Sequence, residues 1–145
     1  MTIPFPKRKK LRLENYDYST NGAYFITICT ADKEKYLSRI ISDNGLIKIE
    51  LSPIGKIAEK YIQTIPGIDV YAIMPNHIHM IIVKSNGKPI SSDIRAFKGL
   101  TVKNTSGLKW QRGYYDHVIR DEDDYRIKHE YIETNPARWL DDEYR

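Results

Sequence analysis

The sequence contains little that would tie it to an oxidising compartment or to a membrane. Its 145 residues include one cysteine, Cys29, which cannot form an internal disulfide, so a reducing, intracellular environment is expected. The basic N-terminus is not followed by an apolar run, as a signal peptide would be. The longest stretch without Asp, Glu, Lys or Arg, 70–83, is too short to span a bilayer and contains Pro75. We therefore expect a cytoplasmic protein without a membrane partner.

Internal repeats, low-complexity segments and shifts in composition are also lacking. A chain of this length fits one domain with one core, and its apolar fraction of 41% is ordinary for a globular protein. We expect residues 1–145 to form a single domain, with residues 1–19 as a basic arm.

The net charge of +4 is modest, but the basic residues are clustered. Such clusters can neutralise phosphates and release counterions when nucleic acid binds. The alternative is a solvated tail and a solubilising helix face. The candidate DNA-binding residues are Lys7, Arg8, Lys9, Lys10 and Arg12 in the arm, and Arg95, Lys98, Lys103 and Arg112 in the third quarter of the chain.

The pattern of apolar residues predicts an alternation of strands and helices. Runs rich in β-branched and aromatic residues predict strands, and Asn44-Gly45 between two short apolar runs predicts a hairpin. Helices are predicted where capping residues precede apolar residues at helical spacing. The expected strands are 23–30, 68–74, 77–83 and 114–119, the hairpin is 37–49, and the helices begin after Ser52, after Ser91 or Ser92, and after Asp121.

Without the hairpin and the last helix, this order is the βαββαβ pattern of ferredoxin-like and RRM-like folds. The expected fold class is therefore α+β, with an antiparallel sheet and two helices on one face. The extra C-terminal helix is left to pack on the other face or on an edge.

Two histidines stand in an otherwise apolar predicted strand, at His77 and His79. Because side chains alternate along a strand, both imidazoles point to the same face. Two imidazoles so placed suit a shared metal ion, although each could instead be a hydrogen-bonded core residue. A metal held only by this pair would need further donors.

The last predicted helix brings Tyr131 and Asn135 to one of its sides, because they are four residues apart. The tyrosine could be a nucleophile and the asparagine an oxygen donor to the metal. Taken alone this is a weak signal, because the chain has 11 tyrosines and most tyrosines pack in cores or at surfaces.

Three segments together resemble the successive motifs of the REP-associated tyrosine transposases, which belong to the wider HUH single-strand endonucleases. They are Met74-Pro-Asn-His-Ile-His79, then the segment Trp110 to Arg120, then Tyr131-Ile-Glu-Thr-Asn-Pro136. The arm and the first predicted strand are similar to that family as well, so the resemblance covers nearly the whole chain.

The resemblance implies a site and a chemistry. His77 and His79 match the metal-binding pair, Tyr131 matches the nucleophile, and Asn135 stands where related transposases have a glutamine ligand. Asp116 and His117 lie in a family motif, and structural hydrogen bonding is at least as good an interpretation of them as catalysis. The implied cofactor is a divalent metal, Mg²⁺ or Mn²⁺, and the implied substrate is single-stranded or hairpin DNA of the repetitive extragenic palindrome type.

The expected activity is that of a single-strand DNA endonuclease and strand transferase that works through a 5′-phosphotyrosine. Two other functions stay open at this point. One is a non-catalytic RRM-like nucleic-acid-binding module, which would need exposed aromatics such as Tyr24 and Phe25 on its central strands. The other is a phosphoesterase that uses metal-activated water. Both a monomer and a homodimer are compatible with the sequence.

Overall fold

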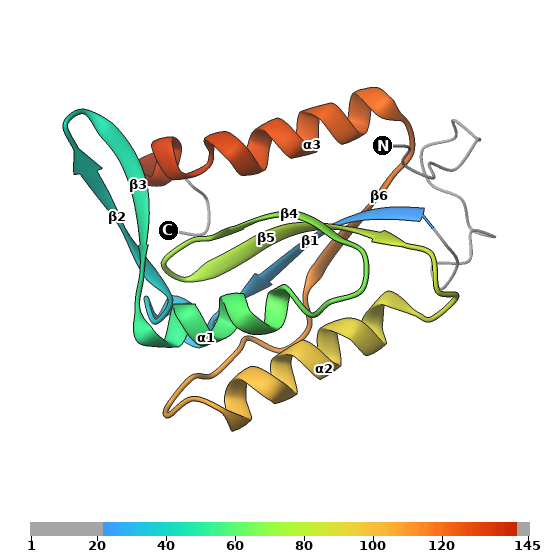
Figure 1. The fold of residues 1–145 in the computed structure, drawn as a ribbon, viewed down its shortest axis with the longest axis horizontal. Coiled ribbons are helices and arrows are strands. Elements are labelled where there is room, and N and C mark those ends of the chain that lie inside the picture. Colours follow the sequence, from blue (N-terminus) through green and yellow to red (C-terminus); the bar gives the residue numbers. More distant parts are fainter. Residues whose placement is uncertain (1–21, 142–145) are drawn as a thin grey trace.

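The computed structural model describes residues 22–141, which form a four-stranded sheet, a two-stranded hairpin and three α-helices (Figure 1). The basic arm predicted over 1–19, with Lys7, Arg8, Lys9, Lys10 and Arg12, lies outside the described residues. The elements are β1 (Gly22–Cys29), η1 (Ala31–Lys33), β2 (Ser38–Asp43), β3 (Leu46–Leu51), α1 (Pro53–Ile62), β4 (Ile68–Ile73), β5 (His77–Lys84), α2 (Ile90–Lys103), β6 (Tyr115–Ile119), α3 (Glu122–Thr134) and η2 (Pro136–Asp141).

The main sheet has the strand order β4-β5-β1-β6, and every neighbouring pair is antiparallel. β1 lies in the centre because its residues are apolar on both faces, so both must be covered. This arrangement confirms the predicted ferredoxin-like α+β fold, with β2 and β3 as the inserted hairpin. The register sets Thr27 of β1 opposite His79 of β5, and Cys29 opposite His77.

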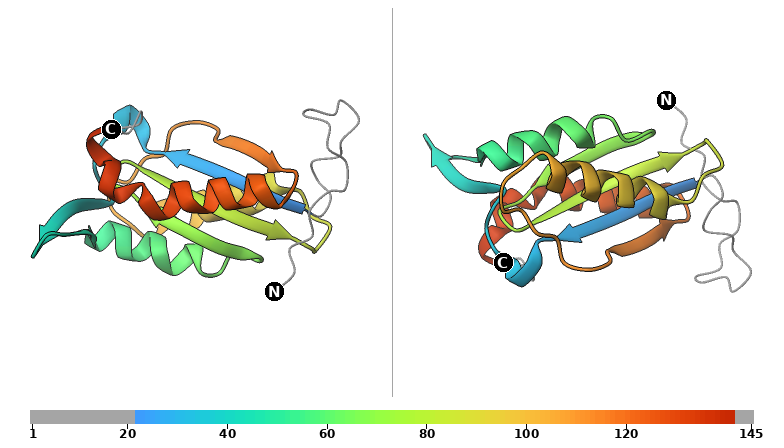
Figure 2. Two further views of the ribbon diagram at one scale, coloured as in Figure 1. Left: turned by 90° about the horizontal axis from the view of Figure 1, so that it is seen from above. Right: turned by 90° about the horizontal axis from the view of Figure 1, so that it is seen from below.

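The three helices divide between the two faces of the sheet. Figure 1 shows α1 and α2 on one side and α3 on the other, and Figure 2 shows α3 running across its own face. Tyr24, Ile26 and Ile28 point toward α1 and α2, whereas Ala23 and Phe25 point toward α3. The extra C-terminal helix therefore takes the second face, one of the two places that the sequence allowed.

Local sequence sets most of the turns. Asn44 and Gly45 both have positive φ, at 53° and 82°, as the two central residues of a type I′ hairpin turn require. Gly67 has a φ of +83°, and a Cβ there would lie 2.0 Å from the Val83 carbonyl oxygen. Only glycine can therefore make this turn from α1 into β4 beside the end of β5.

The predicted N-caps are confirmed for α1 and α3 and are wrong for α2. Ser52 accepts a hydrogen bond from the Gly55 amide at 2.9 Å, and Asp121 accepts one from the Asp124 amide at 2.8 Å. The cap predicted at Ser91 or Ser92 is wrong, because α2 begins at Ile90 and Pro89 is its N-cap. The proline ring fixes φ close to the −63° that Pro89 has as N-cap, and the Ser92 hydroxyl donates to the Pro89 carbonyl instead.

Within residues 22–141, no helix has both the length and the apolar character needed to cross a bilayer.

Candidate active site

The histidine pair lies on the face of the sheet that α3 covers. His77 and His79 alternate with Ile78 and Met80, whose side chains enter the core under α1 and α2. Both histidines are buried, and their ring centroids are 4.6 Å apart. The strand geometry expected from the sequence is therefore present, with both imidazoles together at the interface between β5 and α3.

Each imidazole is held through its Nδ1 atom. Nδ1 of His77 is 2.8 Å from Oδ1 of Asn76, whose amide nitrogen donates to the Lys33 carbonyl at 3.4 Å. Since Oδ1 can only accept, the proton of a neutral His77 lies on Nδ1 and its Nε2 has the lone pair. Nδ1 of His79 is 2.8 Å from the Thr27 hydroxyl, which can donate or accept. Partners of this kind fix ring orientation in metal-binding histidines.

Tyr131 projects from α3 to the histidine pair. Its ring centroid is 5.2 Å from that of His79 and 6.0 Å from that of Phe25, and the Phe25 ring stacks on His79 at 5.4 Å. The guanidinium of Arg138 lies over the Tyr131 ring, 5.2 Å from its centroid. A cation here would stabilise negative charge that develops on the tyrosine or on a bound phosphate.

Asn135 follows Tyr131 by four residues and precedes Trp139 by four. Tyr131 reaches His79, and the Trp139 ring stacks on His77 at 6.2 Å, so the chain on either side of Asn135 contacts the histidine pair. Asn135 is buried, and its Oδ1 has no hydrogen-bond partner among the described residues. A buried carbonyl oxygen without a partner is unfavourable, unless another group binds it.

These residues fit a divalent cation in the donor atoms that they offer. Two imidazoles and one amide oxygen make a neutral, three-donor set, which leaves coordination positions for water or for substrate oxygens. Within residues 22–141, no group of three or more His, Cys, Asp or Glu side chains could hold a metal.

Tyr125 lies on the same helix as Tyr131 in a different environment. Its hydroxyl donates to the Asp69 carboxylate at 2.6 Å, and burial together with that carboxylate raises its pKa far above the usual value. The phenol of Tyr125 is thus held protonated and bound to β4. Tyr131, against His79, is the tyrosine of this helix that meets the histidine pair.

His117 and Asp116 are neighbours in β6 but lie in different environments. His117 faces α3 beside Phe25, and its Nε2 is 2.8 Å from the Asp124 carboxylate, whereas Asp116 is exposed. Burial raises the pKa of Asp124, but the hydrogen bond and charge of His117, the Arg120 amide and Lys128 outweigh it and lower the pKa. His117 therefore ties β6 to the first turn of α3, which is the structural interpretation given above.

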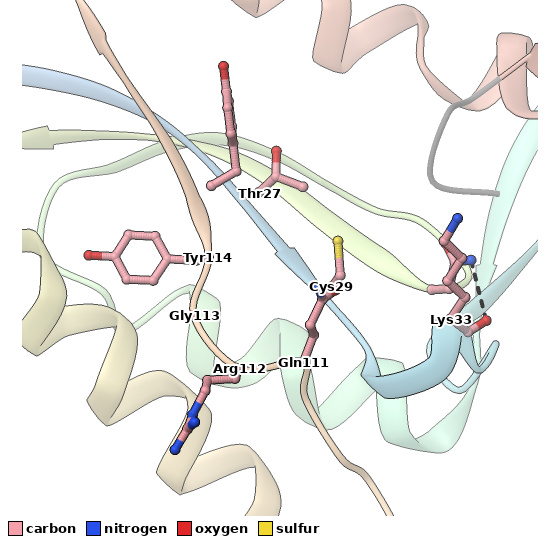
Figure 3. Close-up of a pocket in the computed structure, with 9 residues that line it drawn as sticks. Thr27, Cys29, Lys33, Gln111, Arg112, Gly113 and Tyr114 are labelled. Atoms are coloured by element: carbon pink, nitrogen blue, oxygen red, sulfur yellow. Dashed lines mark hydrogen bonds between the residues drawn. The ribbon is translucent and has the colours of Figure 1, made fainter.

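A cavity of about 540 Å³ lies at the end of β1 (Figure 3). Among its lining residues are Thr27 and Asn76, the two side chains that hold the histidines. Its other wall is the segment 111–114, and Figure 3 shows Arg112 extending from this segment toward α2. Of the predicted DNA-binding residues, Arg112 is the one that lines this cavity.

The remaining predicted DNA-binding residues of the described chain lie on the other face of the sheet, along α2. Arg95 and Lys103 are exposed, as Arg112 is, whereas the Lys98 ammonium donates to the carbonyls of Gln111 and Gly113 at 2.9 and 2.5 Å. Several residues around the histidine pair and Tyr131 could not be predicted from the sequence. Those residues are Thr27, Arg138 and Trp139, and only packing reveals them because no local motif marks them.

Comparisons with known proteins agree with this architecture. No protein-family model matches the chain. An uncharacterised protein of Haemophilus influenzae is 34% identical over 169 aligned residues, covering 94% of this chain and 92% of the relative. A second H. influenzae protein, named "Putative REP-associated tyrosine transposase", is 25% identical over 146 residues, covering 87% of this chain and 77% of the relative.

Among solved structures, a REP-associated tyrosine transposase bound to a REP hairpin has the same fold. Its TM-score is 0.64 at 19% identity, covering 89% of this chain and 74% of that one. The family indicated by the three sequence motifs is thus also the one named for the 25% identical relative and for the solved structure with the similar fold. The chain belongs to one family with the first H. influenzae protein, and its similarity to the REP-associated tyrosine transposases is confirmed.

Proposed function

We propose that the protein is a metal-dependent single-strand DNA endonuclease and strand transferase, with Tyr131 as its nucleophile. The observation that supports this most is the contact of the Tyr131 ring with the His79 ring across the interface between α3 and the sheet. The two ring centroids are 5.2 Å apart. The two residues are far apart in sequence. The name of the 25% identical relative and the hairpin in the similar structure favour hairpin DNA as the substrate.

In this proposal, a metal ion would be held by Nε2 of His77, Nε2 of His79 and Oδ1 of Asn135. Both histidines use Nδ1 for their partners in the fold, so Nε2 is the ring atom for a metal. When bound, Mg²⁺ or Mn²⁺ neutralises charge on the non-bridging oxygens of the phosphate that is attacked.

The chemical step exchanges one phosphate ester for another. The Tyr131 oxygen bonds to phosphorus and loses its proton, the bond from phosphorus to the 3′ oxygen breaks, and that oxygen leaves as a 3′-hydroxyl. The product is a 5′-phosphotyrosine. Because an ester replaces an ester, a 3′-hydroxyl can reverse the step and join two strands.

The contact of Tyr131 with His79 lies within one chain, as cleavage in cis requires. The RRM-like alternative is not favoured, because Tyr24 and Phe25 are buried beneath the helices rather than exposed for base stacking.

The decisive test is a denaturing gel of protein incubated with hairpin DNA and Mn²⁺. We expect a covalent protein–DNA band whose DNA-bearing peptide, mapped by mass spectrometry, contains Tyr131. Tyr131→Phe should remove the band and the cleavage, and Tyr125→Phe is the matched control that should keep both. Cleavage by Tyr131→Phe with no adduct would overturn the proposal and favour a phosphoesterase that uses activated water.

A further inference from the structure

Arg138 is a cation beside the proposed nucleophile, and neither the proposed metal ligands nor the predicted DNA-binding residues include it. Its guanidinium carbon lies 5.2 Å from the centroid of the Tyr131 ring, and the same ring contacts His79. The next residue along the chain, Trp139, stacks on His77. A phosphate in contact with the phenol oxygen of Tyr131 would therefore also lie within reach of the Arg138 guanidinium.

The end of α3 sets the position of Arg138. Pro136 has no amide proton, so α-helical hydrogen bonding stops there and the tighter turns of η2 follow. At Arg138 the backbone leaves the helical conformation, with φ −108° and ψ 23°, and its amide donates to the Asn135 carbonyl at 3.0 Å. The side chain reaches back along α3, where Nη2 donates to the Thr134 hydroxyl at 2.8 Å. The fold thus orients the guanidinium before any substrate binds, which favours binding.

The charge of Arg138 is not neutralised by any carboxylate that the structure describes. Arg126 of α3, by contrast, pairs with Asp123 at 3.2 Å. Among the side chains placed in the structure, none forms an ion pair with Arg138. A guanidinium has five N–H donors, and the hydrogen bond to Thr134 uses one of them. Because Arg138 is exposed, its other donors can bind an entering anion, and their planar arrangement matches two oxygens of a phosphate.

We propose that Arg138 binds the phosphate that reacts at this site and holds it during the transfer. The phosphate is a diester before the step and a diester after it, so it carries one negative charge in both states. Between them, negative charge builds up on its non-bridging oxygens. Arg138 donates hydrogen bonds to these oxygens and keeps all of its protons. That the phosphate belongs to DNA rests on the proposed function, whereas the place of the cation rests on the structure.

The first part of the test compares two substitutions of Arg138 with a matched control. The measurements are single-turnover cleavage of hairpin DNA at saturating Mn²⁺ and the affinity of metal-free protein for the hairpin, by fluorescence anisotropy. Loss of one donor to the reacting group typically slows a reaction by about 10²–10³-fold, so we expect this loss of rate for Arg138→Ala, with an affinity near that of wild type. Arg138→Lys keeps the charge without the planar fork and should lie in between. The control, Arg126→Ala, removes an exposed arginine of the same helix and should cleave like wild type.

The second part separates a role at the phosphate from support of the Tyr131 ring. Free guanidinium at millimolar concentration should restore part of the rate of Arg138→Ala, because it can supply the missing charge and donors. Urea at the same concentration is planar and similar in size but neutral, and it should restore nothing. The measurement is the initial rate of Arg138→Ala as a function of the concentration of each compound.

The outcomes separate this inference from the proposed function. A wild-type rate in Arg138→Ala, or a loss that guanidinium restores no better than urea, would overturn the assignment of Arg138. If wild-type protein cleaves without a Tyr131 adduct, and Arg138→Ala loses this activity and regains it with guanidinium, Arg138 stands and the proposed nucleophile falls. If the adduct forms equally fast in wild type and Arg138→Ala, the reverse holds. Absence of any cleavage by wild-type protein would overturn both.

Discussion

The two faces of the main sheet differ in what their helices bury. α1 buries Ala58 and Ile62, and α2 buries Ile90, Ile94 and Phe97. These side chains meet Tyr24, Ile26 and Ile28 of β1 in a continuous core. α3 fully buries only Ile132, and its other contacts with the sheet are made by residues with polar groups, including Tyr125 and Tyr131.

We expect one face of the sheet to determine the stability of the fold and the other to carry the candidate active site. The hydrophobic effect scales with apolar area, so the face under α1 and α2 should provide most of the folding free energy. Polar groups beneath α3 contribute less to folding, but they stand close together in a site with little competing water, where electrostatic interactions are strong. Substitutions on the two faces should therefore affect different measurements.

The largest expected effect is on catalysis, at the histidine pair. In the proposed function His79 is a metal ligand, and loss of such a ligand removes several kcal/mol of charge stabilisation, so His79→Ala should slow hairpin cleavage about a thousandfold or more. Its melting temperature should change little by comparison. The measurement is single-turnover cleavage over a Mn²⁺ titration, and wild-type rates at limiting Mn²⁺ would contradict the role of His79.

On the opposite face, Phe97→Ala should act on stability. Phe97 is buried in the core between α2 and β1 and supports the Trp110 ring, so its removal should lower the free energy of unfolding by about 3–5 kcal/mol. Urea denaturation measures this value. At low temperature, where the variant is still folded, the Tyr131 adduct should form at near the wild-type rate.

A smaller effect is expected from Thr27→Val, which keeps the shape of the side chain and removes the hydroxyl that holds His79. Outer partners of metal-binding histidines typically change metal affinity by about 10–100-fold. We expect a shift of this size in the Mn²⁺ concentration needed for half-maximal cleavage, with near wild-type rates at saturation. An unchanged Mn²⁺ dependence would show that His79 does not need this partner.

The smallest effect is expected at the start of α3. Asp121→Ala removes the side chain that accepts from the Asp124 amide, and the loss of such a cap typically costs about 1 kcal/mol. Because α3 has little apolar contact with the sheet, this loss should fray the helix locally before it unfolds the protein. Hydrogen exchange should rise at the first turn of α3 and stay low in β1 and β5.

Much of this architecture could be predicted from the sequence because its signals are local. Alternation in 77–83 set both histidines on one face, the turn at Asn44-Gly45 set the hairpin, and Asp121 marked the start of α3. The predicted cap of α2 was wrong because the helix begins earlier, at Ile90, so that Ser91 and Ser92 lie in its first turn and Pro89 is the N-cap.

Strand alternation and helical spacing alone place His77 and His79 on one side of their strand, and Tyr131 and Asn135 on one side of their helix. Periodicity is a property of a few consecutive residues, so it could not say which face of the sheet receives α3. Packing decided that, and with it the contact of Tyr131 with His79 and the burial of Asn135. The cavity between α2 and the segment 110–114 likewise exists only because that segment folds back on α2, where the Lys98 ammonium donates to the carbonyls of Gln111 and Gly113.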